Sequence, residues 1–314
     1  MNILIIDEMH PSIIPLLEKE GFRVDYRPDI LRSEIEEVIH GYHGLLIRSK
    51  TTMDRSLLEK ASQLQFIGRA GAGLDKIDLD YLEERGISLY NAPEGNRDAV
   101  AEHAIGMLLA LFNHLPRADR QVRQKIWNRE QNRGEELSGK TVGIFGYGNM
   151  GETFAKKLSG FDVNVLAYDK YKTGFGSGFA EESSFERIQE EADILSIHVP
   201  LTNETRNFFT LEVFEAFKKP FYLINTARGE VVSFDTLNKA LDSGKLRGAL
   251  LDVLEKEKLD KLDPVQEEAF WNLVRRDNVL FSPHVAGWTF QSYEKINKVL
   301  VNKLLAGLRK NNFK

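Results

Sequence analysis

The stretch "KTVGIFGYGNMG" (residues 140–151) joins a short apolar run to three glycines in a G-x-G-x-x-G pattern. The helical pattern "NMGETFAKKLSG" continues from it. In a strand–turn–helix of this kind, the glycines permit a tight turn and bring backbone amides close to a pyrophosphate at the helix N-terminus. The pattern therefore predicts a dinucleotide-binding unit, with cofactor contacts from Gly146, Gly148, Asn149, Met150 and Gly151.

An acidic residue follows at the distance that such a unit requires. The next apolar run, "VNVLAYD", ends in Asp169, eighteen residues after Gly151. A carboxylate at this point accepts hydrogen bonds from the adenosine ribose hydroxyls and repels a 2′-phosphate, so we interpret the cofactor as NAD. Two neighbouring cations, Lys170 and Lys172, argue in the opposite direction. A structural glycine turn without a ligand is the alternative interpretation of the loop.

Apolar runs and helical patterns alternate on both sides of the loop, which is typical of parallel sheets whose two faces are buried. Six runs are expected as strands of one unit: "TVGIF", "VNVLAYD", "DILSIHVP", "FYLINTARG", "RGALLDV" and "NVLFSPH". That number fits a doubly wound dinucleotide fold. The Gly/Ser-rich segment 172–184 is expected to be a flexible surface connection.

The residues before the glycine loop show the same alternation. Strands are expected at 3–6, 44–48, 64–68 and 87–91, and a helix at 12–21. The turn-rich "NAPEGNRDA" (91–99) closes this first unit. A helix at 290–310 has apolar residues at helical spacing and is expected to return to it.

The stretch from 99 to 122 is apolar on nearly all sides of a helix, so it must be buried on several sides. It could be a core helix of one domain or pack across a dimer interface. The polar arm "RQKIWNREQNRGEEL" that follows is extended enough to embrace a partner, so we expect a homodimer formed through residues 99–127.

The composition limits the classes of protein. A length of 314 residues suits two domains, and 42% hydrophobic with 28% charged residues describes a folded globular chain. A net charge of −5 gives no reason to expect nucleic acid or an anionic membrane as a partner. The absence of cysteine excludes disulfides, thiolate metal sites and cysteine nucleophiles, and we expect no metal. No secretory signal or membrane span is expected, which favours the cytoplasm.

A nicotinamide cofactor implies hydride chemistry on a small molecule, which needs a base, a cation and a carboxylate that orients the base. Arg228 follows the run "YLIN" and His284 follows "VLF", so both lie at expected strand ends. The carboxylate could be Asp252, Glu255 or Glu257, and spacing does not choose among them. A strand-end histidine that only hydrogen-bonds a neighbour is the alternative for His284.

The motifs "NTARGEVV", "LLDVLEKE" and "FSPHVAGW", in this order after the glycine loop, resemble the D-isomer-specific 2-hydroxyacid dehydrogenases. The resemblance implies two Rossmann/flavodoxin-like, doubly wound parallel-sheet α/β domains with a cleft between them. The substrate domain would comprise 1–93 and 285–314, and the NAD-binding domain 94–284.

The resemblance also implies roles for single residues. Arg228 would bind the substrate carboxylate, and His284 would be the catalytic acid/base. Glu257 would orient His284, because the family's catalytic glutamate comes five residues after the aspartate that is Asp252 here. The family usually has proline at the place of Lys258. Further implied cofactor contacts are His198, Val199, Pro200, Thr205, Thr226, Ala227, Asp252 and Gly287.

The segments "LLIRSKT" and "FIGRAGAGLDKID" resemble the D-3-phosphoglycerate dehydrogenase branch, which acts in serine biosynthesis. Two cations beyond Arg228 would suit a substrate phosphate. Ion pairs with Asp75 or Glu102 are the alternative for these two arginines. The candidate substrate contacts are Arg48, Arg69, Ala70, Gly71, Ala72 and Gly73.

Two other functions fit the same residues. A glyoxylate or hydroxypyruvate reductase would use the same catalytic groups, and an NAD-sensing corepressor-like protein would use only the cofactor site. The sequence ends soon after the helix expected at 290–310, so we expect no regulatory C-terminal module.

Overall fold

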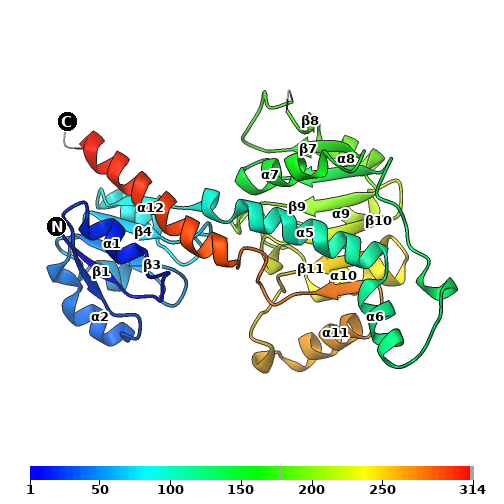
Figure 1. Cartoon of the computed structure of the whole chain (residues 1–314), viewed down its shortest axis with the longest axis horizontal. Coiled ribbons are helices and arrows are strands. Elements are labelled where there is room, and N and C mark those ends of the chain that lie inside the picture. The colour runs from blue at the N-terminus through cyan, green and yellow to red at the C-terminus, as the bar shows by residue number, and fades with distance from the viewer. Residues whose placement is uncertain (177, 312–314) are drawn as a thin grey trace. The chain divides into compact units, whose positions relative to one another are not determined.

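The computed structural model describes residues 1–176 and 178–311, and of 310 and 311 only the backbone. The chain divides into two compact units, unit 1 (Met1–Arg97 with Trp288–Lys314) and unit 2 (Asp98–Gly287), whose elements are labelled in Figure 1. The sequence placed the boundaries at 93 and 285. The turn η2 (Pro93–Gly95) packs on helix α12 so closely that a Cβ on Gly95 would lie 2.6 Å from the Ile296 Cα, which explains why it belongs to unit 1.

Unit 2 is built on one parallel sheet with the strand order β12-β11-β10-β9-β6-β7-β8 (Figure 1). The order reverses beside β6, which pairs with β7 on one side and β9 on the other, so a ligand crevice is expected at the carboxyl end of β6. The predicted doubly wound α/β sheet is confirmed. The strands are β6 (Thr141–Phe145), β7 (Asn164–Tyr168), β8 (Glu181–Glu182), β9 (Ile194–Ile197), β10 (Phe221–Asn225), β11 (Leu246–Leu251) and β12 (Val279–Phe281).

The seventh strand, β8, lies in the segment 172–184 that was expected to be a flexible connection, and that prediction is wrong for these two residues. Leu166 and Ala167 of β7 pair with Glu181 and Glu182. A two-residue strand at a sheet edge is held by backbone hydrogen bonds and needs no apolar side chains, so the sequence pattern did not reveal it. Ser177, in the same segment, lies outside the described residues.

Helices cover both faces of this sheet, and its central strands β6, β9 and β10 are buried throughout. One face packs against α5 (Arg97–Phe112) and α7 (Asn149–Leu158). The opposite face packs against α8 (Phe185–Glu191), α9 (Leu211–Glu215), α10 (Phe234–Asp242) and α11 (Pro264–Val274).

The apolar stretch at 99–122 forms two helices, where the sequence suggested one. α5 ends at Phe112 and α6 spans Leu115–Arg123. His114 between them has a φ of 50°, a left-handed conformation that stops an α-helix. Nine residues of α5 are buried, whereas α6 buries none.

Unit 1 has a five-stranded parallel sheet in the order β2-β1-β3-β4-β5. The strands are β1 (Asn2–Ile5), β2 (Arg23–Tyr26), β3 (Gly44–Ile47), β4 (Phe66–Arg69) and β5 (Ser88–Asn91). The sequence did not predict β2, an edge strand with no buried residue. One face packs against α1 (Ile13–Glu18) and α12 (Phe290–Asn311), the predicted returning helix. The other face packs against α2 (Arg32–Val38), α3 (Arg55–Leu58) and α4 (Leu79–Glu84).

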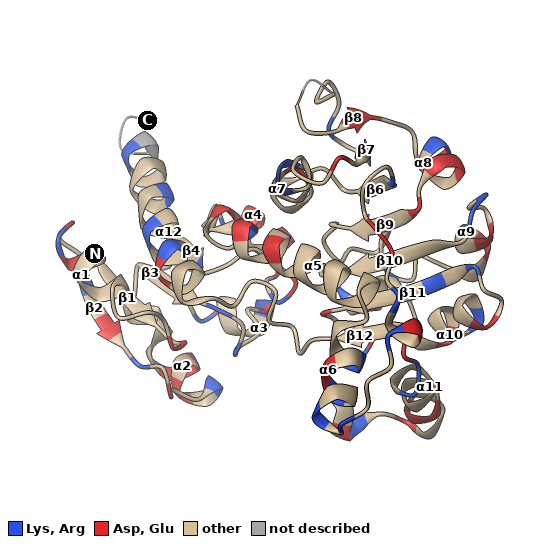
Figure 2. Cartoon of the chain, turned by 45° about the vertical axis from the view of Figure 1, so that its right-hand side comes forward, with Lys and Arg blue, Asp and Glu red and all other residues tan. Residues whose placement is uncertain are grey.

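The remaining short turns of 3-10 helix are η1 (Ile39–Gly41), η3 (Glu130–Asn132), η4 (Gly229–Val231) and η5 (Leu259–Lys261). Lys and Arg residues are interspersed with Asp and Glu residues along the helices of both units (Figure 2). No helix within 1–176 and 178–311 has the length and apolar character that crossing a membrane requires.

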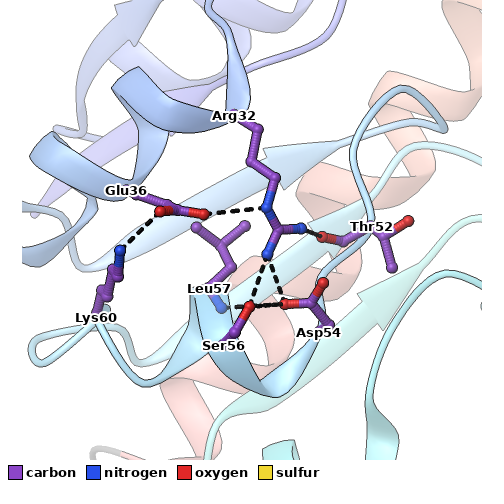
Figure 3. Close-up of polar contacts among 7 residues, drawn as sticks. All are labelled: Arg32, Glu36, Thr52, Asp54, Ser56, Leu57 and Lys60. Carbon is purple, nitrogen blue, oxygen red and sulfur yellow. Dashed lines mark hydrogen bonds and ion pairs between the residues drawn. The ribbon is translucent and has the colours of Figure 1, made fainter.

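A polar network ties α2 to α3 in unit 1 (Figure 3). The Arg32 guanidinium donates to Glu36 at 3.1 Å, to the Thr52 carbonyl at 2.9 Å and to Asp54 at 2.7 Å. Asp54 is also the N-cap of α3, because its carboxylate accepts the backbone N–H of Leu57 at 3.1 Å. The Arg32 and Ser56 hydrogen bonds hold the pKa of the Asp54 carboxyl well below its usual value.

We expect Asp54→Ala to lower the free energy of unfolding by about 1 kcal/mol, the usual effect of losing a helix cap. Asp54→Asn keeps the capping oxygen and loses only a half-exposed ion pair, so its loss should be smaller. Urea titration followed by circular dichroism measures both. Equal losses in the two variants would show that the charge, rather than the cap, stabilises this corner.

Candidate active site

Three neighbouring strands deliver the predicted catalytic residues to one edge of unit 2. β10, β11 and β12 are adjacent and parallel, with Asn225 paired to Leu251 and Leu251 paired to Phe281. Arg228, Asp252 and His284 each follow the carboxyl end of one of these strands. Since carboxyl ends of parallel strands share one edge, these residues come together although they are far apart in the sequence.

Asp252 is the buried anchor of this edge, with 1% of its surface exposed. Its carboxylate accepts the Ser282 hydroxyl at 2.5 Å and the backbone N–H groups of Val285 and Ala286, each at 2.9 Å. Its backbone carbonyl accepts the N–H of His284 at 2.7 Å. Asp252 therefore fixes the loop that carries His284. The resemblance placed this residue at the nicotinamide amide, and the structure shows contacts to its own chain.

The structure brings into contact His284 and Glu257, the two residues for which the resemblance implies an acid/base role. The Nδ1 of His284 lies 2.8 Å from the Oε1 of Glu257, and 48% of the histidine side chain and 49% of the glutamate side chain are exposed. The Glu257 hydrogen bond raises the pKa of His284 above 6.5, against the opposing effects of desolvation and of Arg228. The charged imidazolium form of His284 is thus favoured.

The structure separates the three acids that spacing did not distinguish. Glu255 accepts the backbone N–H of Phe234 at 2.7 Å and so supports the start of α10. Asp252 holds the loop through its carboxylate, whereas the carboxylate of Glu257 hydrogen-bonds the His284 ring. Lys258 has a φ of −83°, which is close to the value that proline would fix, so the loop has nearly the geometry that the family's usual proline would impose.

Arg228 follows a tightly fitted turn. Buried Asn225 accepts the Ala227 N–H at 3.1 Å and donates to the Arg228 carbonyl at 2.9 Å, which orients the backbone. A Cβ on Gly229 would lie 1.8 Å from the Leu254 carbonyl oxygen, so only glycine fits there. This close approach brings the arginine turn against the segment that leads to Glu257.

The glycine loop fits a dinucleotide. Gly146 has a φ of 98°, and a Cβ on Gly151 would lie 2.1 Å from the Gly146 carbonyl oxygen, so these two glycines close the turn against the helix. A Cβ on Gly148 would meet nothing within 4 Å, so this backbone is open to an approaching pyrophosphate. Thr226, directly after β10, has a buried hydroxyl oxygen with no hydrogen-bond partner among the described residues.

Asp169 is oriented by the loop itself, because its carboxylate accepts the N–H of Tyr147 at 2.8 Å. The two lysines that would suit a 2′-phosphate lie near acids instead. The Nζ of Lys170 lies 2.6 Å from Glu204, and the Nζ of Lys172 lies 3.6 Å from Glu152. This arrangement favours the ribose diol of NAD over the 2′-phosphate of NADP.

Two implied cofactor contacts have structural partners in their own chain. His198 lies beyond β9, where its Nε2 is 2.8 Å from the Ser196 hydroxyl, and burial lowers its pKa to about 4, so the ring is neutral. The Thr205 hydroxyl donates to the Pro200 carbonyl at 2.7 Å and closes a turn. Their side chains therefore shape the loop after β9, whose backbone borders the crevice beside β6.

Arg48 lies at the carboxyl end of β3 in unit 1. Its guanidinium carbon is 4.3 Å from the Trp288 ring centroid and 5.2 Å from that of Tyr293, and it donates to the Glu8 carbonyl at 2.9 Å. Among the residues that the structure describes, no carboxylate pairs with it within 4.0 Å. A surface pocket of about 550 Å³ opens beside it, where the sheet order reverses between β1 and β3.

The second arginine of unit 1, Arg69, ends β4, and its guanidinium donates to the Ala70 carbonyl at 3.2 Å. Glu102, which was one alternative partner for the two arginines, pairs with Lys157 at 2.8 Å. Gly71, Ala72 and Gly73 follow in the same loop, where the Ala72 carbonyl accepts from Asn91 at 2.9 Å.

Sequence reasoning missed two residues at the edge that carries His284. Ser282 bonds Asp252, and His103 of α5 lies 2.8 Å from Ser282. Ser282 stands in the quoted "FSPHVAGW" motif, so its position was a signal. His103 lies inside an apolar helix and gave none. The described ranges contain no group of three or more His, Asp or Glu that could hold a metal ion.

Together, the parallel sheet, the glycine loop and Asp169 define a nicotinamide-dinucleotide-binding α/β protein, with the His284–Glu257 pair at the carboxyl edge of the same sheet. A family profile described as the D-isomer specific 2-hydroxyacid dehydrogenase NAD binding domain matches residues 105–286. The chain belongs to this family, and its cofactor is NAD(H).

Individual relatives agree with this assignment. The D-3-phosphoglycerate dehydrogenase of Archaeoglobus fulgidus is 33% identical over 97% of this chain and 57% of its own length. The hydroxypyruvate reductase of Thermotoga maritima is 33% identical over 93% of each chain. A D-lactate dehydrogenase from Aquifex aeolicus, solved with NAD and lactic acid, superposes with a TM-score of 0.82 at 27% identity, covering 99% of this chain and 96% of that one. This chain spans little more than half the length of several relatives named D-3-phosphoglycerate dehydrogenase.

We expect Glu257→Gln to lower the pKa of His284, because the amide cannot stabilise the imidazolium as a carboxylate does. Desolvation and Arg228 then oppose protonation, with only Asp252 still favouring it. NMR titration of the ring, assigned through His284→Ala, measures the change. The matched control is Glu255→Gln, a substitution two residues away that should leave the pKa of His284 unchanged. An unchanged midpoint in Glu257→Gln would contradict the assigned pair.

Proposed function

We propose that this protein is an NAD-dependent D-2-hydroxyacid dehydrogenase that transfers hydride between the nicotinamide and C2 of its substrate. The observation that carries the proposal is the 2.8 Å contact between His284 and Glu257 at the strand edge that also presents Arg228. Family membership and the glycine loop support it. Bound NADH would supply the hydride, and every other step falls to side chains of this chain.

In the reducing direction, the Arg228 guanidinium would hold the substrate carboxylate through paired hydrogen bonds, which fixes the carbonyl carbon. The imidazolium of His284 would donate its Nε2 proton to the carbonyl oxygen as that oxygen becomes an alkoxide. Glu257 would keep the imidazole in the orientation and protonation state that this transfer needs. In the oxidising direction, neutral His284 would take the hydroxyl proton.

We propose D-3-phosphoglycerate and 3-phosphohydroxypyruvate as the substrate pair, which would place the protein in serine biosynthesis in the cytoplasm. Arg48 supports this choice, because its guanidinium is oriented by two rings and a carbonyl and has no carboxylate partner among the described residues. A guanidinium held in this way suits a phosphate. Arg69 and the 70–73 loop would contribute on the same unit.

A hydroxypyruvate or glyoxylate reductase is the second candidate, since the relative from Thermotoga maritima covers almost the whole chain. An NAD-sensing corepressor-like protein is a candidate from another class, but the filled acid/base positions favour an enzyme over it.

The deciding measurement is NADH oxidation with 3-phosphohydroxypyruvate, hydroxypyruvate and glyoxylate, compared side by side. We expect the phosphorylated acid to give the highest kcat/KM, and His284→Ala to lower kcat about 10²- to 10⁴-fold on any substrate. A preference for an unphosphorylated acid would favour the reductase. Cofactor binding without turnover on any 2-oxo acid would favour the corepressor-like protein.

The role of Arg48 has its own readout in the same assay. Arg48→Met should raise KM for the phosphorylated substrate about 10- to 100-fold, because it removes a charged hydrogen bond. It should leave hydroxypyruvate nearly unaffected. Arg55→Met is the matched control, since Arg55 is another unit 1 arginine and pairs with Glu84. Equal changes in KM for both substrates in Arg48→Met would show that Arg48 has a structural role and does not bind the phosphate.

We further propose that two copies associate through α6 and the arm after it, within residues 99–127. Four apolar side chains there are exposed: Leu115, Val122, Ile126 and Trp127, the last at 80%. Leu115 and Val122 lie on α6, which buries no residue, and Ile126 and Trp127 follow it in the arm, so this segment offers exposed apolar side chains to a partner surface.

Sedimentation velocity should show a dimer, and Trp127→Ser should weaken it about 30-fold, because a central tryptophan commonly contributes 2 kcal/mol or more to an interface. Val265→Ser is the control, since this exposed valine lies on α11, outside the arm. A monomer in the wild type, or a dimer unaffected by Trp127→Ser, would contradict the proposed interface.

A further inference from the structure

His103 lies beneath the edge that carries His284, and neither the proposed mechanism nor the cofactor site uses it. It belongs to α5, whose neighbouring residues Ala104 and Leu108 are fully buried against the sheet of unit 2. The Nε2 of His103 lies 2.8 Å from the Ser282 hydroxyl oxygen, and 27% of its side chain is exposed. Met107, one turn further along α5, has its sulfur 3.5 Å from the same oxygen.

The direction of the hydrogen bonds follows from the number of protons available. Ser282 has one hydroxyl proton, and ionised Asp252 can only accept, so the 2.5 Å bond between them uses that proton. The Ser282 oxygen is then left as an acceptor for His103. The network thus assigns a proton to the Nε2 of His103 and forms a chain from His103 through Ser282 to Asp252.

This chain of hydrogen bonds ends at the Asp252 carboxylate, which holds the loop that carries His284. The Asp252 oxygen that accepts Ser282 also accepts the N–H of Val285 at 2.9 Å, and the other oxygen accepts Ala286 at 2.9 Å. The Nε2 of His103 lies 3.6 Å from the first of these oxygens. Because His284 directly precedes these two amides, a rotation of the carboxylate would shift the backbone that carries the imidazole.

We propose that His103 is a positioning residue for the acid/base chemistry of His284, acting through the Ser282 hydroxyl on the Asp252 carboxylate. The inference rests on the proposed function for its kinetic consequence, but its structural consequence is independent of turnover. His103 does not contact a substrate and transfers no proton in the reaction. It supplies one N–H that keeps Ser282 directed at Asp252.

The test uses His103→Leu, which removes the donor, and His103→Gln, whose amide places an N–H near the same point. We expect His103→Leu to lower kcat about 10- to 100-fold, the range seen when a reacting group is displaced by about an ångström, with KM for NADH unchanged. His103→Gln should stay within about 3-fold of the wild type by the same argument. Glu102→Gln is the matched control on α5, since Glu102 pairs with Lys157 and Lys157 lies on α7.

Ser282→Ala and the double variant His103→Leu/Ser282→Ala complete a cycle. Since His103 acts through the Ser282 hydroxyl, the double variant should lose no more kcat than Ser282→Ala alone. Losses that multiply would show independent effects and overturn the proposal. Ser282→Ala also keeps the proposal testable if His103→Leu fails to fold.

NMR titration of the His284 ring distinguishes this inference from the proposed function. The wild-type ring contacts Glu257, and Arg228 and Asp252 are the other charged groups that act on it. If His103 positions the loop, the His284 midpoint falls toward its ordinary value in His103→Leu and returns in His103→Gln. An unchanged midpoint, or no return with glutamine, overturns the proposal. If the wild type reduces no 2-oxo acid, the proposed function is wrong, and this titration still decides the role of His103.

Discussion

A carboxylate that is almost completely buried must find hydrogen-bond donors, and Asp252 finds them in the loop that carries His284. Leaving such a charge unpaired would cost several kcal/mol, so the loop cannot move away without a large loss of stability. This single requirement joins the end of β11 to the end of β12. It also fixes the backbone N–H of His284, which donates to the carbonyl of the same aspartate.

His284 itself is held in an unfavourable conformation. Its φ of 55° lies in the left-handed region, which costs a residue other than glycine about 1–2 kcal/mol. The three hydrogen bonds to the Asp252 carboxylate offset that cost. Strained residues persist where surrounding contacts determine them, and here the contacts are those of a buried anion. The left-handed turn directs the ring to Glu257 instead of along the strand.

Much of the fold was accessible from the sequence, because buried parallel strands leave continuous apolar runs and the glycine loop marks a strand-to-helix turn. The two edge strands β2 and β8 were missed, since their stability comes from backbone pairing with few buried side chains. The break between α5 and α6 was missed because it depends on the left-handed backbone of His114, whose side chain gives no such signal.

The site was predictable to a lesser degree, for a physical reason. Asp252, Glu255 and Glu257 are chemically alike and lie within six residues, so composition and spacing assign them no roles. Their roles differ through packing: one is buried under three donors, one supports a helix start, and one faces an exposed imidazole. The resemblance to a known family pointed to Glu257, and the structure shows that it contacts His284. The resemblance carried no information on His103, which contacts a residue 179 positions away in the sequence.

The proposed acid/base pair has to be both exposed and well positioned, and these two requirements oppose each other. A group that must meet substrate has to be exposed, yet an exposed side chain on a loop is free to sample many rotamers. Here the exposed pair, His284 and Glu257, is attached to backbone whose freedom is removed from below by a buried anion. The buried hydrogen bonds to Asp252 therefore fix the backbone, and the fixed backbone restricts the exposed His284 side chain. It follows that the backbone of His284 is held by buried hydrogen bonds at the strand ends beneath it, while the exposed Glu257 hydrogen-bonds its ring.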